Sequence, residues 1–222
     1  MLRAAIFDMD GLLVDSEPLW QEAELEVLGA LGVPITREAC VETRGLRADE
    51  VVALWFRRHP WEAPSEREVH GRLLEAMAAL IRTRGRPMPG AHEAIASIRR
   101  RTGRLGLATS SPRVLIDAVL ETLDVRDAFD AVHSAEHEPY GKPHPAVFLS
   151  AARLLDAAPT DCVALEDSLA GVVSAKAARM ACIAVPEAEQ AGDPRFAIAD
   201  RVLGSLLELE SVDWEALAAA KR

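Results

Sequence analysis

The chain has 222 residues, half of them hydrophobic, and a formal net charge of −10. That hydrophobic content is typical of a folded protein with a sizeable core and argues against disorder. The acidic balance argues against nucleic acid as a partner because the chain would repel a polyanion. No apolar run reaches the roughly 18 residues of a membrane span, so we expect no membrane partner either.

The cysteines and the first residues indicate a compartment. Cys40, Cys162 and Cys182 are far apart and odd in number, which favours free buried thiols over disulfides or a zinc cage. The apolar start is short and is broken by Asp8, unlike a secretory signal. We therefore expect a soluble, cytoplasmic protein, with a monomer as the default.

Short, fully apolar runs alternate with helical patterns along most of the chain. Such runs are typical of strands buried on both faces of a parallel sheet. Strands separated by helices predict an α/β fold with a Rossmann-like, doubly wound parallel sheet. The predicted strands are 4–7, 105–108, 131–135, 162–165 and 182–185, and the predicted helices are 92–103, 112–123, 145–155 and 169–179.

The segment after the first predicted strand breaks this alternation, because it has helical patterns and no convincing strand. Residues 16–32 begin with a serine suited to capping a helix and end with a glycine. Residues 66–85 repeat apolar side chains at helical spacing. The glycines and prolines of 83–90 suit a return hinge. We predict a helical cap domain at 16–87, inserted into a core formed by 1–15 and 88–222.

Polar side chains follow several of the predicted strands. Ligands of an open parallel sheet bind outside the carboxyl ends of its strands. That edge receives two carboxylates from the first strand, three hydroxyls from the second, two carboxylates from the fourth and one lysine from a connection. These residues are Asp8, Asp10, Thr109, Ser110, Ser111, Glu166, Asp167 and Lys142.

The acids at this edge would repel one another unless a cation lay between them. Oxygen ligands of this kind suit Mg²⁺, which commonly keeps sites for water and a phosphate. Each motif alone has an ordinary structural interpretation, such as a turn, a helix cap or a surface charge. Their joint placement at one edge favours a functional site.

Four of these segments, DMDGLLVDS, LATSS, YGKPHP and ALEDSLAG, resemble the four ordered motifs of the haloacid dehalogenase-like (HAD) phosphohydrolases. The helical segment resembles the helical type of cap in that family. Within it, the chain looks closest to the hexitol phosphatase and 2-deoxyglucose-6-phosphate phosphatase group. The resemblance implies Mg²⁺-dependent hydrolysis of small sugar or sugar-alcohol phosphates.

The resemblance also implies roles for individual residues. Asp8 is expected to be the nucleophile that forms an aspartyl-phosphate, and Asp10 the general acid and then general base. Mg²⁺ would be held by Asp8, the Asp10 backbone carbonyl and Asp167, with Glu166 bound through water. Lys142, Thr109, Ser110 and Ser111 would hold the phosphate, and Gly11 would let backbone amides approach it. Expected cap contacts are Ser16, Trp20, Gly45, Leu46 and Arg47.

Two of the cap assignments have alternatives. Arg47 is expected to reach sugar hydroxyls, or else to be a solvated charge at a helix start. Trp20 is expected to be a residue of the cap core, with a sugar platform as the alternative. The related β-phosphoglucomutases have a histidine at this position, which orients the general acid, so Trp20 favours hydrolysis over mutase chemistry. A phospho-accepting signalling module is the least favoured alternative, because receiver domains lack the helical insertion.

Overall fold

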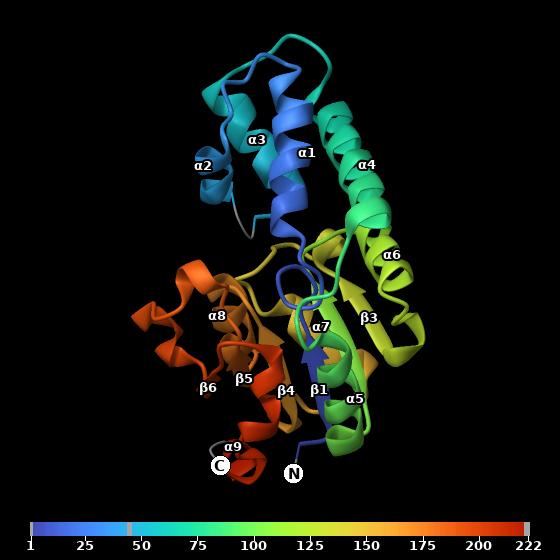
Figure 1. Cartoon of the computed structure of the whole chain (residues 1–222), viewed down its shortest axis with the longest axis vertical. Coiled ribbons are helices and arrows are strands. Elements are labelled where there is room, and N and C mark those ends of the chain that lie inside the picture. Colours follow the sequence, from blue (N-terminus) through green and yellow to red (C-terminus); the bar gives the residue numbers. More distant parts are fainter. Residues whose placement is uncertain (1, 44–45, 220–222) are drawn as a thin grey trace.

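A six-stranded parallel sheet forms the centre of the protein, in the order β3-β2-β1-β4-β5-β6 (Figure 1). The structure, a computed structural model, describes residues 2–43 and 46–219, and only the backbone of residue 189. The strands are β1 (Ala4–Phe7), β2 (Leu105–Thr109), β3 (Ala131–Ser134), β4 (Cys162–Glu166), β5 (Ala181–Ala184) and β6 (Arg201–Val202).

Helices cover both faces of the sheet, as the apolar runs predict. Successive side chains of a strand point to opposite faces, so Phe7 packs in one hydrophobic cluster and Ile6 in another. The cluster around Phe7 includes side chains of α5 (Ala91–Thr102) and α6 (Arg113–Thr122). The cluster around Ile6 includes side chains of α7 (Ala146–Leu154) and α8 (Leu169–Ala177). The predicted doubly wound α/β fold is confirmed.

Four helices lie at the end of the molecule beyond the carboxyl ends of the strands (Figure 1). Helices α1 and α3 pack against α4, whose Leu73, Met77 and Ile81 are fully buried. The first turn of α4 is fixed by Ser65, whose hydroxyl and backbone N–H both interact with Glu68. These helices are α1 (Glu17–Gly29), α2 (Arg37–Cys40), α3 (Ala48–Arg58) and α4 (Glu66–Arg84).

The remaining helices are short and lie in connections or near the end of the chain. They are η1 (Val41–Thr43), η2 (Arg126–Ala128), η3 (Ala135–His137), η4 (Pro159–Asp161), η5 (Ala188–Gln190), η6 (Pro194–Ile198), η7 (Leu206–Ser211) and α9 (Trp214–Ala219). Within the described part of the chain, the helices are too short or too polar to cross a membrane.

Candidate active site

The carboxyl ends of β1, β2 and β4 bring the predicted polar residues to one place. Asp8 follows β1, and its backbone N–H donates to the Leu165 carbonyl of β4 at 3.0 Å. Thr109 is the last residue of β2 and Glu166 the last of β4. All three are almost fully buried, so their side chains are held by the ends of the strands rather than by mobile loops.

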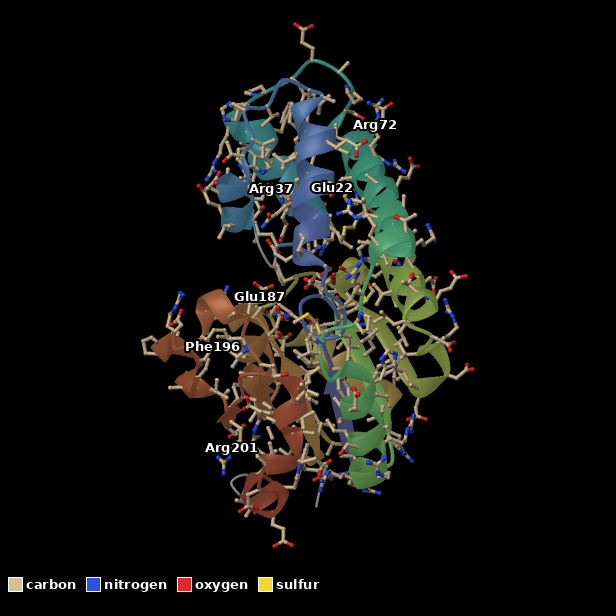
Figure 2. All side chains as sticks on the ribbon, viewed as in Figure 1. Glu22, Arg37, Arg72, Glu187, Phe196 and Arg201 are labelled. Carbon is tan, nitrogen blue, oxygen red and sulfur yellow. The ribbon has the colours of Figure 1, made fainter. Side chains whose placement is uncertain are left out.

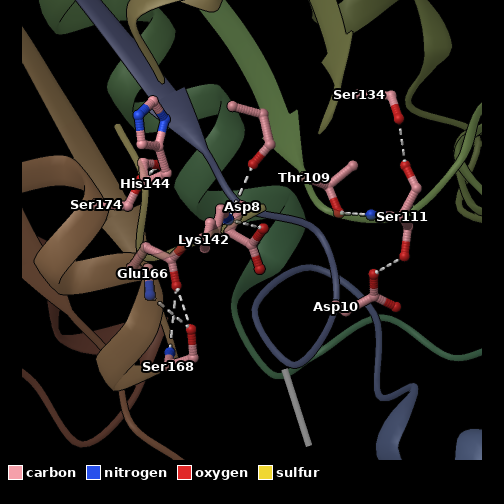
Figure 3. Close-up of polar contacts among 12 residues, drawn as sticks. Asp8, Asp10, Thr109, Ser111, Ser134, Lys142, His144, Glu166, Ser168 and Ser174 are labelled. Atoms are coloured by element: carbon pink, nitrogen blue, oxygen red, sulfur yellow. Dashed lines mark hydrogen bonds and ion pairs between the residues drawn. The ribbon is translucent and has the colours of Figure 1, made fainter. Parts of the chain in front are cut away.

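Lys142 places a positive charge between two of these carboxylates. Its Nζ lies 2.5 Å from Asp8 Oδ1, contacts Glu166 Oε1, and donates to the Ala108 carbonyl at 3.2 Å (Figure 3). Its side chain is 5 % exposed, so water screens these ion pairs only weakly. Lys142 therefore fixes the orientation of the Asp8 carboxylate.

The acids nevertheless outnumber this ammonium group. Burial, together with the Glu166 and Asp10 charges, raises the pKa of Asp8 to about 7 against the opposing effect of Lys142. Loss of hydration, with the Glu166 and Asp8 charges, also raises the pKa of Asp167 well above its usual range. Burial would lower the pKa of Lys142, but Asp8 and Glu166 outweigh it and raise it. The site thus favours an additional cation.

The Asp10 carboxylate is held by donors from two separate parts of the chain. Ser111 Oγ donates to Asp10 Oδ2 at 2.6 Å, and Ser134 Oγ in turn donates to the Ser111 carbonyl at 2.7 Å (Figure 3). From helix α1, Trp20 Nε1 donates to Asp10 Oδ1 at 3.4 Å. Asp10 therefore points away from the Lys142 ion pairs, although it belongs to the same pocket.

The hydroxyl cluster after β2 is arranged in a tight turn. Thr109 Oγ1 accepts from the Ser111 backbone N–H at 3.0 Å, which leaves the threonine proton for another acceptor. Ser110 Oγ is buried and has no hydrogen-bond partner in the described structure, and Ser110 lines the same pocket. Both hydroxyls are thus able to donate to an anion placed beside Asp8.

The acidic cluster has the composition of a magnesium site. Asp8, Glu166 and Asp167 each offer an oxygen, and these atoms lie within 4.8 Å of one another. Gly11, at φ +73°, leaves room for Asp167, because a Cβ there would collide with Asp167 Oδ2. All the donors are oxygen, as a hard divalent cation prefers. The residues present therefore fit Mg²⁺.

Glu166 differs from the other two acids because both of its oxygens already accept hydrogen bonds. Oε1 accepts from Lys142, while Oε2 accepts from the backbone N–H and hydroxyl of Ser168 at 3.2 and 3.0 Å. Its side chain is fully buried and does not line the pocket. This arrangement favours contact with a cation through water.

One pocket lies between the strand ends and the helices α1 to α3. Of the predicted site residues, it is lined by Asp8, Asp10, Gly11, Ser16, Trp20, Leu46, Arg47, Thr109, Ser110, Ser111, Lys142 and Asp167. The predicted contact Gly45 lies outside the described residues. The fold thus brings these predicted site residues, which are far apart in the sequence, together in one pocket.

Arg47 lies at the start of α3 and spans the pocket to the sheet side. Its Nε and Nη2 donate to the Asp49 carboxylate at 3.1 and 3.0 Å, and its Nη1 donates to the Glu138 carbonyl at 3.4 Å. Its side chain is 19 % exposed. Arg47 is therefore mostly buried against the loop of Glu138 rather than solvated, and because it lines the pocket its contact with sugar hydroxyls stays a prediction.

Three acidic residues of the pocket, Glu17, Glu24 and Glu187, were missed by the sequence analysis. Glu24, on α1, is 4 % exposed and lines the pocket from the helical side. Glu187, which follows β5, lines it from the sheet side, and Figure 2 shows it on the part of the sheet unit that faces the helices. The signal for Glu24 was its spacing of four residues from Trp20, which places both on one helix face. No comparable signal marks Glu187.

The fold and the site define a family. The sequence profile of the haloacid dehalogenase-like hydrolases matches residues 2–179, so the chain belongs to this family and is an enzyme. It is similar to hexitol phosphatase B of Escherichia coli (strain K12), with 49 % identity over 96 % of both chains.

Two further relatives extend the comparison. The chain is 27 % identical to the β-phosphoglucomutase of Bacillus subtilis (strain 168), over 96 % of both chains. The crystal structure of CbbY from Rhodobacter sphaeroides in complex with phosphate superposes with a TM-score of 0.86 at 32 % identity, covering 94 % of this chain and 96 % of that one. The expected family and enzyme class are confirmed.

Proposed function

We propose that this protein is a Mg²⁺-dependent phosphatase that hydrolyses small sugar or sugar-alcohol phosphates, such as hexose 6-phosphates, 2-deoxyglucose 6-phosphate and hexitol phosphates. The observation that carries the proposal is that Asp8, Asp10, Lys142 and Asp167 all line the same pocket beneath the helices. The 49 % identity to a hexitol phosphatase supports the substrate class.

In the proposed reaction, Asp8 attacks the phosphorus atom and the bond to the ester oxygen breaks. Asp10 donates its proton to that oxygen, because an alkoxide is a poor leaving group. Water then attacks the aspartyl-phosphate and gives a proton to Asp10, which frees Asp8 and inorganic phosphate. The hydrogen bonds from Ser111 and Trp20 support this role by holding Asp10 in place.

Lys142 and the hydroxyls of Thr109 and Ser110 would bind the phosphate oxygens, with Gly11 allowing close approach of the backbone. Asp8, Asp167, the Asp10 carbonyl and, through water, Glu166 would hold Mg²⁺. When bound, the ion would offset the repulsion between the Asp8 carboxylate and the anionic phosphate.

We further propose that residues 16–87 act as a cap domain over a core of 1–15 and 88–222. Helices that cover a site exclude water and supply contacts to the leaving group. The contact of Arg47 with the Glu138 carbonyl supports a closed arrangement of these two parts.

A phosphate-release assay tests the proposal. The purified protein would be incubated with a panel of hexose, 2-deoxyhexose and hexitol phosphates, with Mg²⁺ or with a chelator. We expect free phosphate from several of these esters in Mg²⁺ and none with chelator.

The mutase alternative is tested in a separate reaction that contains β-glucose 1-phosphate and a trace of glucose 1,6-bisphosphate. Glucose 6-phosphate that forms without free phosphate would contradict the proposal. Trp20 in place of the mutase histidine, and the weaker identity to the mutase, support hydrolysis.

A further inference from the structure

One face of helix α1 leads from the catalytic carboxylates into the helical side of the pocket. Ser16, Trp20 and Glu24 are four residues apart, lie on this face and line the pocket. Trp20 contacts Asp10, which we propose protonates the leaving group. Glu24 lies four residues further along the helix, about 6 Å beyond along its axis. An extended six-carbon leaving group would have a comparable length.

The Glu24 carboxylate receives few hydrogen bonds from the described residues. Thr43 Oγ1 lies 3.2 and 3.5 Å from its two oxygens, but the same hydroxyl lies 2.8 Å from the Cys40 carbonyl. A hydroxyl has one proton, so these acceptors share it. The Cys40 thiol is the other donor, and thiols donate weakly. As far as the described residues go, a buried carboxylate with up to four acceptor positions is thus left with capacity to spare.

A carboxylate is an expensive choice at this position. Glu24 lies in the buried stripe of α1 with Leu19, Ala23 and Leu28, where an apolar side chain would avoid the cost of desolvation. That cost is visible in the pKa of Glu24, which burial raises to about 7 although Thr43 and Cys40 lower it. Packing alone therefore does not explain the glutamate.

Arg47 cannot replace Glu24 as an acceptor for hydroxyl protons, because a guanidinium group only donates hydrogen bonds. Three of its N–H groups already donate to the Asp49 carboxylate and to the Glu138 carbonyl. The hydroxyl protons of a leaving group need an acceptor, and Glu24 offers one on the helical side of the pocket.

We propose that Glu24 determines specificity for a polyol leaving group by accepting hydrogen bonds from its hydroxyls, with Thr43 positioning the carboxylate. This inference rests on the proposed phosphatase function and assigns the sugar end of the same pocket. The ligand class is a hydroxyl-rich phosphate monoester of about six carbons.

The experiment compares two phosphate esters in the same enzyme. One is a hexitol 6-phosphate, and the other is p-nitrophenyl phosphate, whose leaving group has no hydroxyl donor once esterified. The quantity measured is the ratio of kcat/KM for the hexitol ester to kcat/KM for the nitrophenyl ester. The variants are Glu24→Leu and Glu24→Gln, and the matched control is Glu26→Gln, an exposed glutamate on the same helix outside the pocket.

We expect Glu24→Leu to lower this ratio about 10- to 100-fold, the loss that hydrogen bonds to a charged acceptor would produce. Glu24→Gln keeps the shape and one acceptor, so we expect a loss of about threefold or more, and Glu26→Gln should match the wild type. The glutamine variant keeps the inference falsifiable should the leucine variant not fold.

A wild-type enzyme that hydrolyses the hexitol ester, with a glutamine variant whose ratio stays within twofold, would overturn this inference alone. A wild-type enzyme that hydrolyses the nitrophenyl ester but none of the polyol phosphates would overturn the proposed function and this inference with it.

Discussion

The indole Nε1 of Trp20 donates a hydrogen bond to Asp10 Oδ1 at 3.4 Å and so links helix α1 to the loop after β1. Trp20 also packs, half-buried, against the main hydrophobic cluster. The residue therefore combines the expected packing role with a contact to the proposed general acid. A helical unit that moved away from the sheet would lose this contact.

We expect Trp20→Phe to lower kcat about two- to tenfold, because it removes one neutral donor and keeps most of the ring. The control is Trp61→Phe, since the Trp61 indole donates to the Pro64 carbonyl away from the pocket. Steady-state kinetics on a sugar phosphate would measure both variants. An equal fall in kcat for the two would show that the Asp10 contact has no special role.

Lys142 should be as important for stability as for activity. Replacing it with methionine leaves Asp8 and Glu166 buried without their ammonium partner, so we expect the free energy of unfolding to fall by about 3–5 kcal/mol. Lys176→Met breaks the partly exposed ion pair with Asp200 and should cost about 1 kcal/mol or less. Urea unfolding in the presence of chelator would measure both, and equal losses would contradict this account.

Glu24 should make stability depend on pH. Its pKa is about 7 in the folded protein against 4.5 ordinarily, so the folded state binds this proton more tightly than the unfolded chain. The protonated Glu24 side chain therefore contributes stability at low pH, and this contribution is lost as the pH rises from about 4.5 to about 7. We expect Glu24→Gln to remove this loss, on the order of 3 kcal/mol above pH 7.

Urea unfolding of the wild type and Glu24→Gln between pH 4.5 and 8.5 would check this dependence. The two stability curves should diverge as pH rises, while Glu26→Gln should follow the wild type. Parallel curves for the wild type and Glu24→Gln would contradict the claim that burial raises the pKa of Glu24 in the folded protein.

Asp167 should set the affinity for Mg²⁺. Replacing it with asparagine removes one of the three acids within reach of a cation, so we expect the Mg²⁺ concentration for half-maximal activity to rise about tenfold or more. Asp156→Asn, at a side chain that is 97 % exposed, is the control. Metal titrations, followed by phosphate release and by calorimetry, would measure Mg²⁺ binding by both variants. Equal affinity of the two variants for Mg²⁺ would refute the assignment.

The sheet was predictable from the sequence because its central strands are short apolar runs that end in polar residues. The run before Asp8 gave β1 with its observed bounds, Ala4–Phe7. The edge strand β6, Arg201–Val202, was missed because its two residues are exposed and show no apolar pattern. A strand of that length is defined by its neighbour β5, which sequence pattern alone does not reveal.

The proposed site residues at the sheet edge were predictable for a related reason, since each one follows a strand or lies on a connection at the same edge. Their orientations were not. Ser111 was expected to bind phosphate, which stays a prediction, and the sequence did not indicate that its hydroxyl donates to Asp10. The contacts of Arg47 with Asp49 and with the Glu138 carbonyl were not indicated by the sequence either. Contacts between segments this far apart depend on how the helices meet the sheet, which local pattern does not encode.

The central claim is that the Asp8 carboxylate receives the phosphoryl group. The most direct test mixes the enzyme with Mg²⁺ and a hexitol phosphate labelled in its phosphoryl group, quenches in acid within one turnover, and maps the labelled peptides. We predict label on the peptide that contains Asp8, with none in Asp8→Asn and a fall in phosphate release of about a thousandfold or more in that variant. An Asp8→Asn variant with full activity, or a label at another residue, would contradict the account.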